Sequence, residues 1–394
     1  MVLDRNMKIG LLTASVFAMA FFAFKKAVDS SEALPSFEKM VLHDVFVSEG
    51  AAVADVNRDG IKDVLAGQYW FEGPDWTKHA ITPLKEFDYT TGYSDSFLNF
   101  SADVNGDGWA DLIRYGFPGK EVVWYENPQG ADKHWEEHHI DSLACNESPM
   151  MVDLYNDGVL DLVYGHEDTG EMMSARFPTH GETTLQIKPL GAKALPGSKR
   201  FSHGLGFGDV NGDGRKDVLI TDGWWEAPLQ PSQKVWTFHP ANLGEACSQM
   251  HTYDFDNDGD ADVITASAHK YGVWWFEQSQ EGGEIIFTRH LIDSSFSQTH
   301  GTELIDMNGD GLPDLVTGKR YFAHQGKDPG GMEAPVLYWF ELSRDADGKP
   351  HWMKHLIDDD SGVGLQVVVE DMNSDDKLDI VFSNKKGVHC FMQE

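Results

Sequence analysis

Short apolar runs separated by turn residues recur from about residue 37 to the C-terminus. Asp217–Ile220 is one such run, and Val273–Phe276 is one of several aromatic runs of similar length. Each run has the length of a strand rather than of a helix, and Gly and Asp punctuate the intervals. The pattern predicts an all-β protein made of short antiparallel strands.

An acidic motif, D-x-[DN]-x-D-G-x-x-D followed by three apolar residues, recurs at intervals of 45 to 65 residues. One strand-like run precedes each copy, and three follow it, the last with the pattern [WF]-x-x-H-x-[IL]. Four strands per repeat are typical of a propeller blade. The copies start at Asp55, Asp103, Asp153, Asp209, Asp254, Asp306 and Asp371.

The two ends of the chain complement each other. The last repeat stops after its third strand, near Gly387–Met392, and Phe37–Leu42 carries the missing fourth-strand pattern. We therefore expect a seven-bladed β-propeller of four-stranded antiparallel blades over residues 37–394, with the last blade completed by the N-terminal strand. Such closure removes exposed sheet edges.

The first residues have the features of an export signal. Ile9–Phe24 is an uncharged run of 16 residues, which is short for a membrane span. Residues 1–26 are thus either a cleaved signal peptide or an uncleaved anchor flanked by Lys25 and Lys26, and residues 27–36 are a linker. Both alternatives predict export to the periplasm, the cell surface or the medium, and the membrane is a partner only through an uncleaved segment.

The formal net charge of −33 arises from 31 basic and 64 acidic residues. Nucleic acid is not an expected partner, because phosphate binding needs a basic surface. The three Cys residues give no disulfide framework. Stability is therefore expected to come from the hydrophobic core and bound cations.

The acidic motif places oxygen ligands at positions 1, 3, 5 and 9, with Gly at position 6 for a tight turn. Hard oxygen ligands favour Ca²⁺ over transition metals. Tyr155 removes a ligand from the copy at Asp153, and Asp376 replaces Gly in the copy at Asp371, so these two should bind weakly or not at all. The ligands of the five complete copies are Asp55, Asn57, Asp59, Asp63, Asp103, Asn105, Asp107, Asp111, Asp209, Asn211, Asp213, Asp217, Asp254, Asp256, Asp258, Asp262, Asp306, Asn308, Asp310 and Asp314.

These repeats resemble the FG-GAP/VCBS-type repeat of integrin α-subunit propellers and of many exported bacterial proteins. Gly206–Gly214 matches it closely, and the resemblance covers nearly all of the chain from residue 37. It implies a propeller with calcium loops between the first and second strands, on one face. It does not choose among adhesion, binding and catalysis.

The repeat separates two kinds of histidine. His79, His138, His239, His290 and His355 share one position of the fourth strand, which indicates a structural role. Other polar residues break the symmetry, and we expect them to surround the axis on the face opposite the calcium loops. They are His203 and His300, six residues before a loop Asp; Glu49, Glu147 and Ser248 at the same offset; His251; and the loop residues His166, Glu167, Asp222, Trp224, Trp225, His269, Tyr271, Lys319, Arg320, His324, Lys385 and Lys386. Cys145 and Cys247 fall in the same zone as free thiols.

This face could catalyse elimination from a carbohydrate, which needs a base, a group that holds the enolate oxygen, and an acid. His203, His251 and His300 are candidates for base, acid or ligands of a second divalent metal, which Glu147 would join. Lys319 and Arg320 could hold the oxyanion. Candidate substrate-binding residues are Glu147, His166, Asp222, Trp224, Trp225 and His269. Trp224, Trp225 and the candidate catalytic residue Tyr271 would stack on a sugar ring.

A second, local resemblance supports that chemistry. Ser202–Gly208 together with Gly223–Pro228 is similar to the propeller domain of aldos-2-ulose and anhydrofructose dehydratases. Those enzymes also carry cupin domains, for which this chain has no room, so their isomerase activity is not implied.

Two alternatives stay open: a non-catalytic module that binds glycan or a surface protein, and a scaffold with no small ligand. Convergence of the site histidines on one point would favour a metal or catalytic site, whereas histidines that point into separate blade junctions would favour binding or a scaffold.

Overall fold

A computed structural model describes residues 34–178, 185–194, 196–229 and 236–394. The chain divides into two compact units, residues 1–34 and 35–394, and the description below concerns the second. The predicted export segment therefore lies outside the described residues, as does most of the predicted linker. Within the described ranges, no helix combines the length and hydrophobicity that crossing a bilayer requires.

The described residues are almost entirely strands and turns, which confirms the predicted all-β class. The one helical element among them is η1, a 3-10 turn at Ala323–Gly326. The strands are β1 (Phe37–His43), β2 (Ala52–Ala54), β3 (Asp63–Ala66), β4 (Tyr69–Glu72), β5 (Thr77–Ala80), β6 (Leu98–Ala102), β7 (Asp111–Tyr115), β8 (Lys120–Glu126), β9 (Glu136–Ala144), β10 (Met150–Val152), β11 (Asp161–His166), β12 (Glu171–Arg176), β13 (Gln186–Pro189), β14 (Leu205–Gly208), β15 (Asp217–Ile220), β16 (Gly223–Glu226), β17 (Thr237–Pro240), β18 (Met250–Tyr253), β19 (Asp262–Ala266), β20 (Tyr271–Glu281), β21 (Glu284–Ser297), β22 (Thr302–Ile305), β23 (Asp314–Gly318), β24 (Leu337–Arg344), β25 (Pro350–Asp358), β26 (Val368–Glu370), β27 (Asp379–Asn384) and β28 (Gly387–Gln393).

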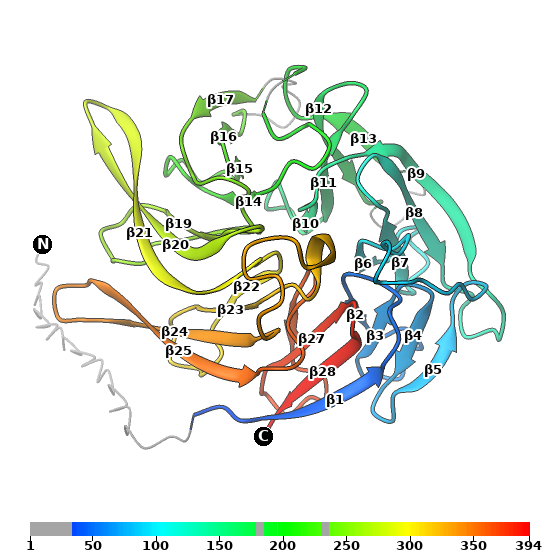
Figure 1. Ribbon diagram of the computed structural model, residues 1–394. Coiled ribbons are helices and arrows are strands. Elements are labelled where there is room, and N and C mark those ends of the chain that lie inside the picture. The colour runs from blue at the N-terminus through cyan, green and yellow to red at the C-terminus, as the bar shows by residue number, and fades with distance from the viewer. Residues whose placement is uncertain (1–33, 179–184, 195, 230–235) are drawn as a thin grey trace, which may run out of the picture. The chain divides into compact units, whose positions relative to one another are not determined.

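Consecutive strands pair as antiparallel meanders. Three sheets have four strands each, in the orders β2-β3-β4-β5, β22-β23-β24-β25 and β1-β28-β27-β26. Two sheets of eight strands, β6 to β13 and β14 to β21, each join two such meanders through one or two residue pairs. Figure 1 shows the sheets around a common centre, with the first strand of each four innermost. This is the arrangement of a β-propeller.

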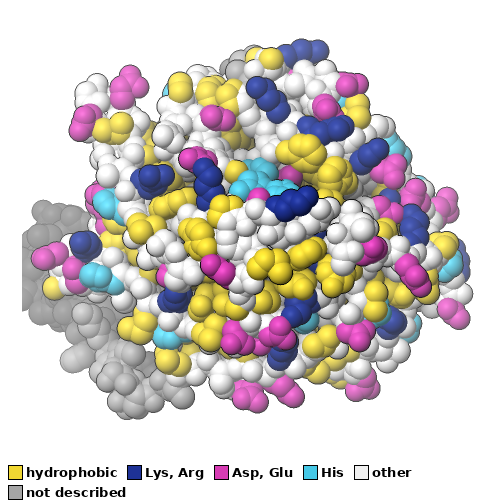
Figure 2. Space-filling model, viewed as in Figure 1, with side chains coloured by type: hydrophobic (Ala, Val, Ile, Leu, Met, Phe, Trp, Pro, Cys, Tyr) yellow, Lys and Arg dark blue, Asp and Glu magenta, His cyan; other side chains and the backbone are white. Residues whose placement is uncertain are grey.

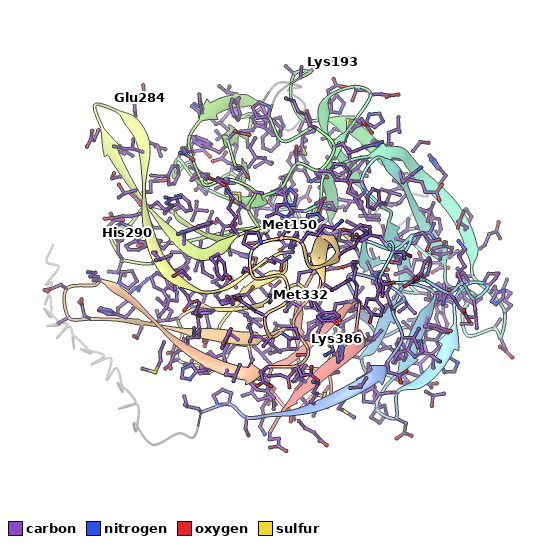
Figure 3. The ribbon with its side chains drawn as sticks, viewed as in Figure 1. Met150, Lys193, Glu284, His290, Met332 and Lys386 are labelled. Atoms are coloured by element: carbon purple, nitrogen blue, oxygen red, sulfur yellow. The ribbon has the colours of Figure 1, made fainter. Side chains whose placement is uncertain are left out.

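The stick view shows the same radial order. In Figure 3, Met150 on the inner strand β10 lies near the centre, whereas Glu284 lies at the tip of the long β20–β21 hairpin on the periphery. The first and last described strands also lie side by side. β1 pairs antiparallel with β28, from Phe37 opposite Gln393 to His43 opposite Val388.

The second strand of each meander is buried and apolar on both faces, because a neighbouring sheet covers each side. In β3, Val64 packs in a cluster with Val381 of β27, while the next residue, Leu65, packs in a cluster with Leu112 of β7. Each such side chain contributes about 1.5–3 kcal/mol on burial. The core is therefore a series of layers between sheets.

The recurring fourth-strand histidines have one shared environment. His79 stacks on Trp70 with ring centroids 4.2 Å apart, and its Nε2 lies 2.7 Å from Glu72 Oε2. The stack and the carboxylate contact recur at His138, His239, His290 and His355, each with a Trp and a Glu of the preceding strand. These contacts account for the repeated histidine by packing within the sheet, as its recurrence predicts.

Candidate functional site

The inner strands separate two groups of polar residues. β14 begins just after His203 and runs directly into the acidic loop at Asp209, and β22 lies in the same way between His300 and Asp306. The histidines and the acidic loops thus occupy opposite ends of the inner strands.

The acidic loops share one backbone conformation. Positions 4 and 6 have positive φ in every copy, as at Arg58 (φ 62°) and Gly60 (φ 89°) in the first. The first Asp of each loop accepts the N–H groups of positions 5 and 6, and in the first loop both bonds to Asp55 are 3.0 Å long. Asp376 also has positive φ, 65°, so the non-glycine copy adopts the turn at a cost in strain.

The last Asp of the loop links the loop to the end of the third strand through two hydrogen bonds. Asp63 accepts N–H groups from Val56 and Gly73, both at 2.8 Å. In the loop at Asp254, oxygens of Asp254, Asp256 and Asp262 lie within 4.8 Å of one another. Such clustered, preformed carboxylates fit a hard cation.

The loop at Asp153 differs from the others in chemistry. Arg176 Nη2 lies 2.5 Å from Asp157, and its Nη1 lies 3.1 Å from the buried Asp161. Its guanidinium also lies 5.4 Å from the ring of Tyr155, the residue that replaces a ligand. The arginine therefore supplies positive charge to this loop.

Three histidines converge at the other end of the inner strands. Ring nitrogens of His203, His269 and His300 lie within 4.8 Å of one another, although the residues come from three different loops. His300 is 3% exposed, and the side chain of His203 is 7% exposed. Figure 2 shows histidines gathered near the middle of this face.

The hydrogen bonds of these rings fix their tautomers. Nδ1 of His203 lies 2.7 Å from Phe201 O, and Nδ1 of His300 lies 3.4 Å from Gln298 O. A carbonyl only accepts, so Nδ1 carries the proton in both rings. Their Nε2 atoms are buried and have no hydrogen-bond partner within the described chain. Nδ1 of His269 lies 3.1 Å from Asp328, which leaves its Nε2 for a ligand.

A buried charge network lies beside the histidines. Glu147 Oε2 lies 3.3 Å from His203 Nε2, without a hydrogen bond between them, and 3.9 Å from Arg320 Nη1. Arg320 is 1% exposed, and its Nε donates to Glu49 at 3.0 Å.

The pKa shifts in this network follow from burial and neighbouring charge. Burial lowers the pKa of His300 well below its ordinary value, and Arg320 lowers it further. Burial lowers the pKa of His269 as well, with a contribution from His203. Burial by itself would raise the pKa of Glu147, but His203 and Arg320 outweigh it and hold that pKa below the ordinary value. Two buried imidazoles of lowered pKa, His269 and His300, thus lie near a carboxylate of lowered pKa, Glu147.

Aromatic rings form the other wall. Phe117 lies 5.4 Å from Tyr93, 5.1 Å from Phe97 and 5.6 Å from Phe201, measured between ring centroids. These four rings and the polar residues enclose a cavity of about 460 Å³, lined also by Glu147, His203, His269, Arg320 and His324. A cavity of this size suits a small organic ligand.

The segment after β23 reaches the same cavity in a strained conformation. Phe322, His324 and Gln325 all have positive φ (54°, 47° and 58°), which non-glycine residues rarely adopt. Asp328 Oδ2 contacts Nδ1 of His324 at 2.8 Å and Nδ1 of His269 at 3.1 Å. In Figure 3, Met332 of this segment lies near the common centre of the sheets.

The structure therefore brings together five of the candidates named from the sequence, because His203, His269, His300, Glu147 and Arg320 share one site. Lys319 is 1% exposed, and its ammonium group donates to Gly330 O, which makes it a support of the strained segment. Tyr271 plays a similar part through a 2.7 Å hydrogen bond to Glu333.

Other candidates lie elsewhere. Trp224 and Trp225 are 4% and 1% exposed, because the sheet packs on both, so neither offers a face to a sugar, contrary to expectation. His251 is held apart, 3.0 Å from Thr302 Oγ1, and burial lowers its pKa to about 4.

Two further candidates and the cysteines also lie outside the cavity wall. His166 contacts Asp141 at 3.3 Å, and Asp222 is exposed. Neither is among the described residues that line the cavity. Cys145 and Cys247 are free and buried, as expected.

Sequence reasoning missed the aromatic wall and Asp328. Tyr93, Phe117 and Phe201 lie in segments between strands, where no repeat marks them. Phe97 could have been found from the sequence, because it lies six residues before Asp103, the same offset from a loop Asp as His203 and His300.

Sequence comparison identifies the repeat. Residues 254–317, which include the acidic loops at Asp254 and Asp306, match the FG-GAP-like repeat family. The chain carries an FG-GAP-like repeat. This match confirms the resemblance to the FG-GAP repeat that the sequence predicted, and the fold confirms the β-propeller. None of the curated proteins matches the chain in sequence.

Solved structures are similar to this FG-GAP-repeat chain in fold. BBS1N, from a complex with ARL6DN, has a TM-score of 0.52 at 11% identity, over 91% of this chain and 97% of that one. A lectin of Agrocybe aegerita that recognises non-reducing terminal N-acetylglucosamine has a TM-score of 0.48 at 17% identity, over 84% and 82%. Rhamnogalacturonan lyase YesW has a TM-score of 0.44 at 12% identity, over 90% and 75%.

Proposed function

We propose that this protein is an exported, calcium-binding, seven-bladed β-propeller whose histidine pocket is a metal-assisted carbohydrate lyase or dehydratase site. One observation carries the catalytic part. Ring nitrogens of His203, His269 and His300, from three different loops, lie within 4.8 Å of one another, beside an aromatic-lined cavity that Glu147 also lines.

The strand pattern supports seven blades and closure by the N-terminus. The meanders follow the seven acidic motifs of the sequence, and β1 supplies the fourth strand beside β28. Closure predicts that removing residues 34–43 exposes the edge of β28 and destabilises the whole domain. Loss of no more than local stability on that truncation would contradict it.

Calcium at five loops is supported by their shared backbone and clustered carboxylates, and by the charge balance. A net charge of −33 repels itself in a compact fold unless cations offset it. Isothermal titration of metal-free protein with calcium should give about five sites, and none in the loop that Arg176 occupies.

The histidine pocket fits a second, borderline metal such as Zn²⁺. His203, His269 and His300 would hold it through Nε2, and Glu147 would be the fourth ligand. A metal-binding histidine usually donates its other ring N–H to a carbonyl or a carboxylate, as the Nδ1 atoms of these three rings can do. When bound, such an ion would act as a Lewis acid that polarises a carbonyl or hydroxyl of the ligand.

The remaining walls suit a sugar. Aromatic faces stack on the apolar faces of sugar rings, and Phe201 is 43% exposed at the rim. Arg320 lies in the wall near Glu147 and can stabilise negative charge that develops on a ligand oxygen. This combination matches elimination next to a carbonyl.

The alternative is a non-catalytic glycan- or protein-binding module. The aromatic wall would serve it equally, but it needs no convergent histidine nitrogens. Turnover separates the two.

The test measures elimination from a panel of keto sugars, anhydro sugars and uronates, with Zn²⁺ present and calcium fixed. We expect turnover by the wild type, and its loss in His203→Ala and His300→Ala. His139→Ala is the matched control, because this exposed histidine lies on the outer strand β9. Glycan binding without turnover across the panel would replace the lyase by the binding module. Export is tested by N-terminal sequencing of protein recovered outside the cytoplasm.

A further inference from the structure

We propose that His324 is the proton-transfer residue of the pocket, and that Asp328 positions both His324 and the metal-ligating His269. This inference rests on the proposed function, and it assigns a catalytic role to a residue outside the metal-binding set.

One carboxylate oxygen serves two imidazoles. Asp328 Oδ2 lies 2.8 Å from His324 Nδ1 and 3.1 Å from His269 Nδ1. The two rings stack, with centroids 4.8 Å apart and planes 24° apart. An ionised carboxylate only accepts, so each neutral ring carries its proton on Nδ1 and offers Nε2 elsewhere. A base oriented by a carboxylate is the arrangement that nucleophile–base triads also use.

The two histidines differ in their surroundings. A ring nitrogen of His269 lies within 4.8 Å of ring nitrogens of His203 and His300, the other histidines of the proposed metal site. His324 is not part of that group, although it forms a second group with His269 and Asp328; it lines the cavity and has a side chain that is 39% exposed. Its Nε2 makes no hydrogen bond to any described residue. It is therefore the imidazole that a ligand in the cavity can reach.

The backbone holds His324 in place at a cost. Phe322, His324 and Gln325 are all left-handed, and such strain persists where the surroundings enforce it, commonly at functional sites. Lys385 Nζ donates to Phe322 O at 3.2 Å, and Lys319 Nζ donates to Gly330 O at the far end of the segment. Both lysines are buried, so the segment is anchored on each side of His324.

The proposed step is an elimination without redox change. His324 Nε2 accepts the proton from the carbon next to the carbonyl of a β-hydroxy keto sugar. The electron pair of that C–H bond forms a C=C bond to the carbonyl carbon, and the carbonyl π pair moves onto oxygen as an enolate. Collapse of the enolate restores the C=O bond and forms the new C=C bond as the C–O bond to the β-hydroxyl breaks. The imidazolium then returns the proton to the departing oxygen, so the sugar loses one water and His324 is neutral again.

The first experiment needs no turnover. Zinc-loaded and metal-free protein are treated with diethyl pyrocarbonate, and modified histidines are located by mass spectrometry. We expect zinc to protect His269 and to leave His324 reactive, whereas His203 and His300, whose Nε2 atoms are buried, should be unreactive in both forms. Zinc affinity should be unchanged in His324→Gln and fall about 10- to 100-fold in Asp328→Ala. Protection of His324, or loss of a zinc in His324→Gln, would show that it is a ligand and overturn the inference.

The second experiment follows proton transfer by NMR in D₂O, with methyl 2-keto-glucoside, which carries a hydroxyl on the carbon β to its carbonyl, as the probe. Exchange at the carbon next to the carbonyl should fall about 100-fold or more in His324→Gln and in Asp328→Ala. Asp328→Glu should restore part of it. His351→Gln and Asp345→Asn are the controls, because they remove another His–carboxylate pair, 3.3 Å apart, that is exposed.

The outcomes separate the two proposals. Exchange that survives His324→Gln overturns the role of His324 and leaves the lyase standing. Wild-type protein that binds zinc but catalyses no exchange overturns both.

Discussion

Replacing His355 with Ala should destabilise the protein more than the same change at His290. Both rings stack on a Trp, at 4.4 Å and 4.6 Å, and both contact a Glu, at 2.8 Å and 2.7 Å. The two histidines differ in how much of the side chain is exposed to solvent. The side chain of His355 is 14% exposed, and that of His290 is 41% exposed.

The magnitudes follow from that exposure. At His355, a shielded bond to a carboxylate is worth about 1.5–3 kcal/mol and the ring pair about 0.5–1.5 kcal/mol, so the loss should be about 2–4.5 kcal/mol. At His290, water screens the carboxylate contact to about 0.2–1 kcal/mol, so with the same ring pair the total loss should be about 0.7–2.5 kcal/mol.

The assay is urea unfolding at saturating calcium, followed by tryptophan fluorescence. His139→Ala should change the free energy of unfolding by less than about 0.5 kcal/mol. Equal losses at His355 and His290, or a larger loss at His290, would refute the claim that the repeated histidine stabilises through shielded contacts with Trp and Glu.

Three further predictions concern cations and pH. Removing calcium with a chelator should lower the melting temperature, because an ion that binds only the folded state stabilises it by about 2.7 kcal/mol per site at 100 times its Kd; an unchanged melting temperature would count against calcium in the loops. Tyr155→Asp combined with Arg176→Ala should add one calcium site in titration calorimetry, whereas Arg176→Ala alone should not, because Tyr155 still lacks the ligand. Burial lowers the pKa of His389 to about 4, so the unfolded chain takes up a proton below pH 6.5 that the folded chain does not. The free energy of unfolding should therefore fall between pH 6.5 and 4 by at most about 3 kcal/mol, and His389→Phe should remove that part of the urea-measured decline.

The fold was predictable because its signals are local and repeated. Each acidic turn, apolar run and Trp–His–Glu set lies within a few dozen residues of sequence, so one copy explains the others. The left-handed φ at position 4 of the acidic loop had no such signal, because Arg58, Asn257 and Ser374 occupy it as well as Gly. Only the turn geometry shows that this position is strained.

The site was predictable only in part, because its walls come from segments that do not repeat. Tyr93 lies in the connection between β5 and β6, and Asp328 lies in the connection between β23 and β24. The corresponding connections of the other repeats differ from these in length and sequence. The opposite error arose at Trp224, which belongs to the repeat: its partner is His239, in the same sheet, rather than a ligand.

A single position of the repeat explains why the pocket could be foreseen at all. Six residues before the first loop Asp, the chain has Glu49, Phe97, Glu147, His203, Ser248, His300 and Leu365. This position precedes the inner strand, so its side chains approach the centre from every direction. Glu147, His203 and His300 build the polar side of the pocket there, Phe97 builds the aromatic side, and Glu49 holds Arg320. Leu365 instead joins a hydrophobic cluster, and Ser248 bonds within its own sheet. Because the strands on either side keep their pattern, this one position can change from Leu to His without altering the sheet that carries it. Variation at this position therefore changes what lies around the centre while the sheets stay the same.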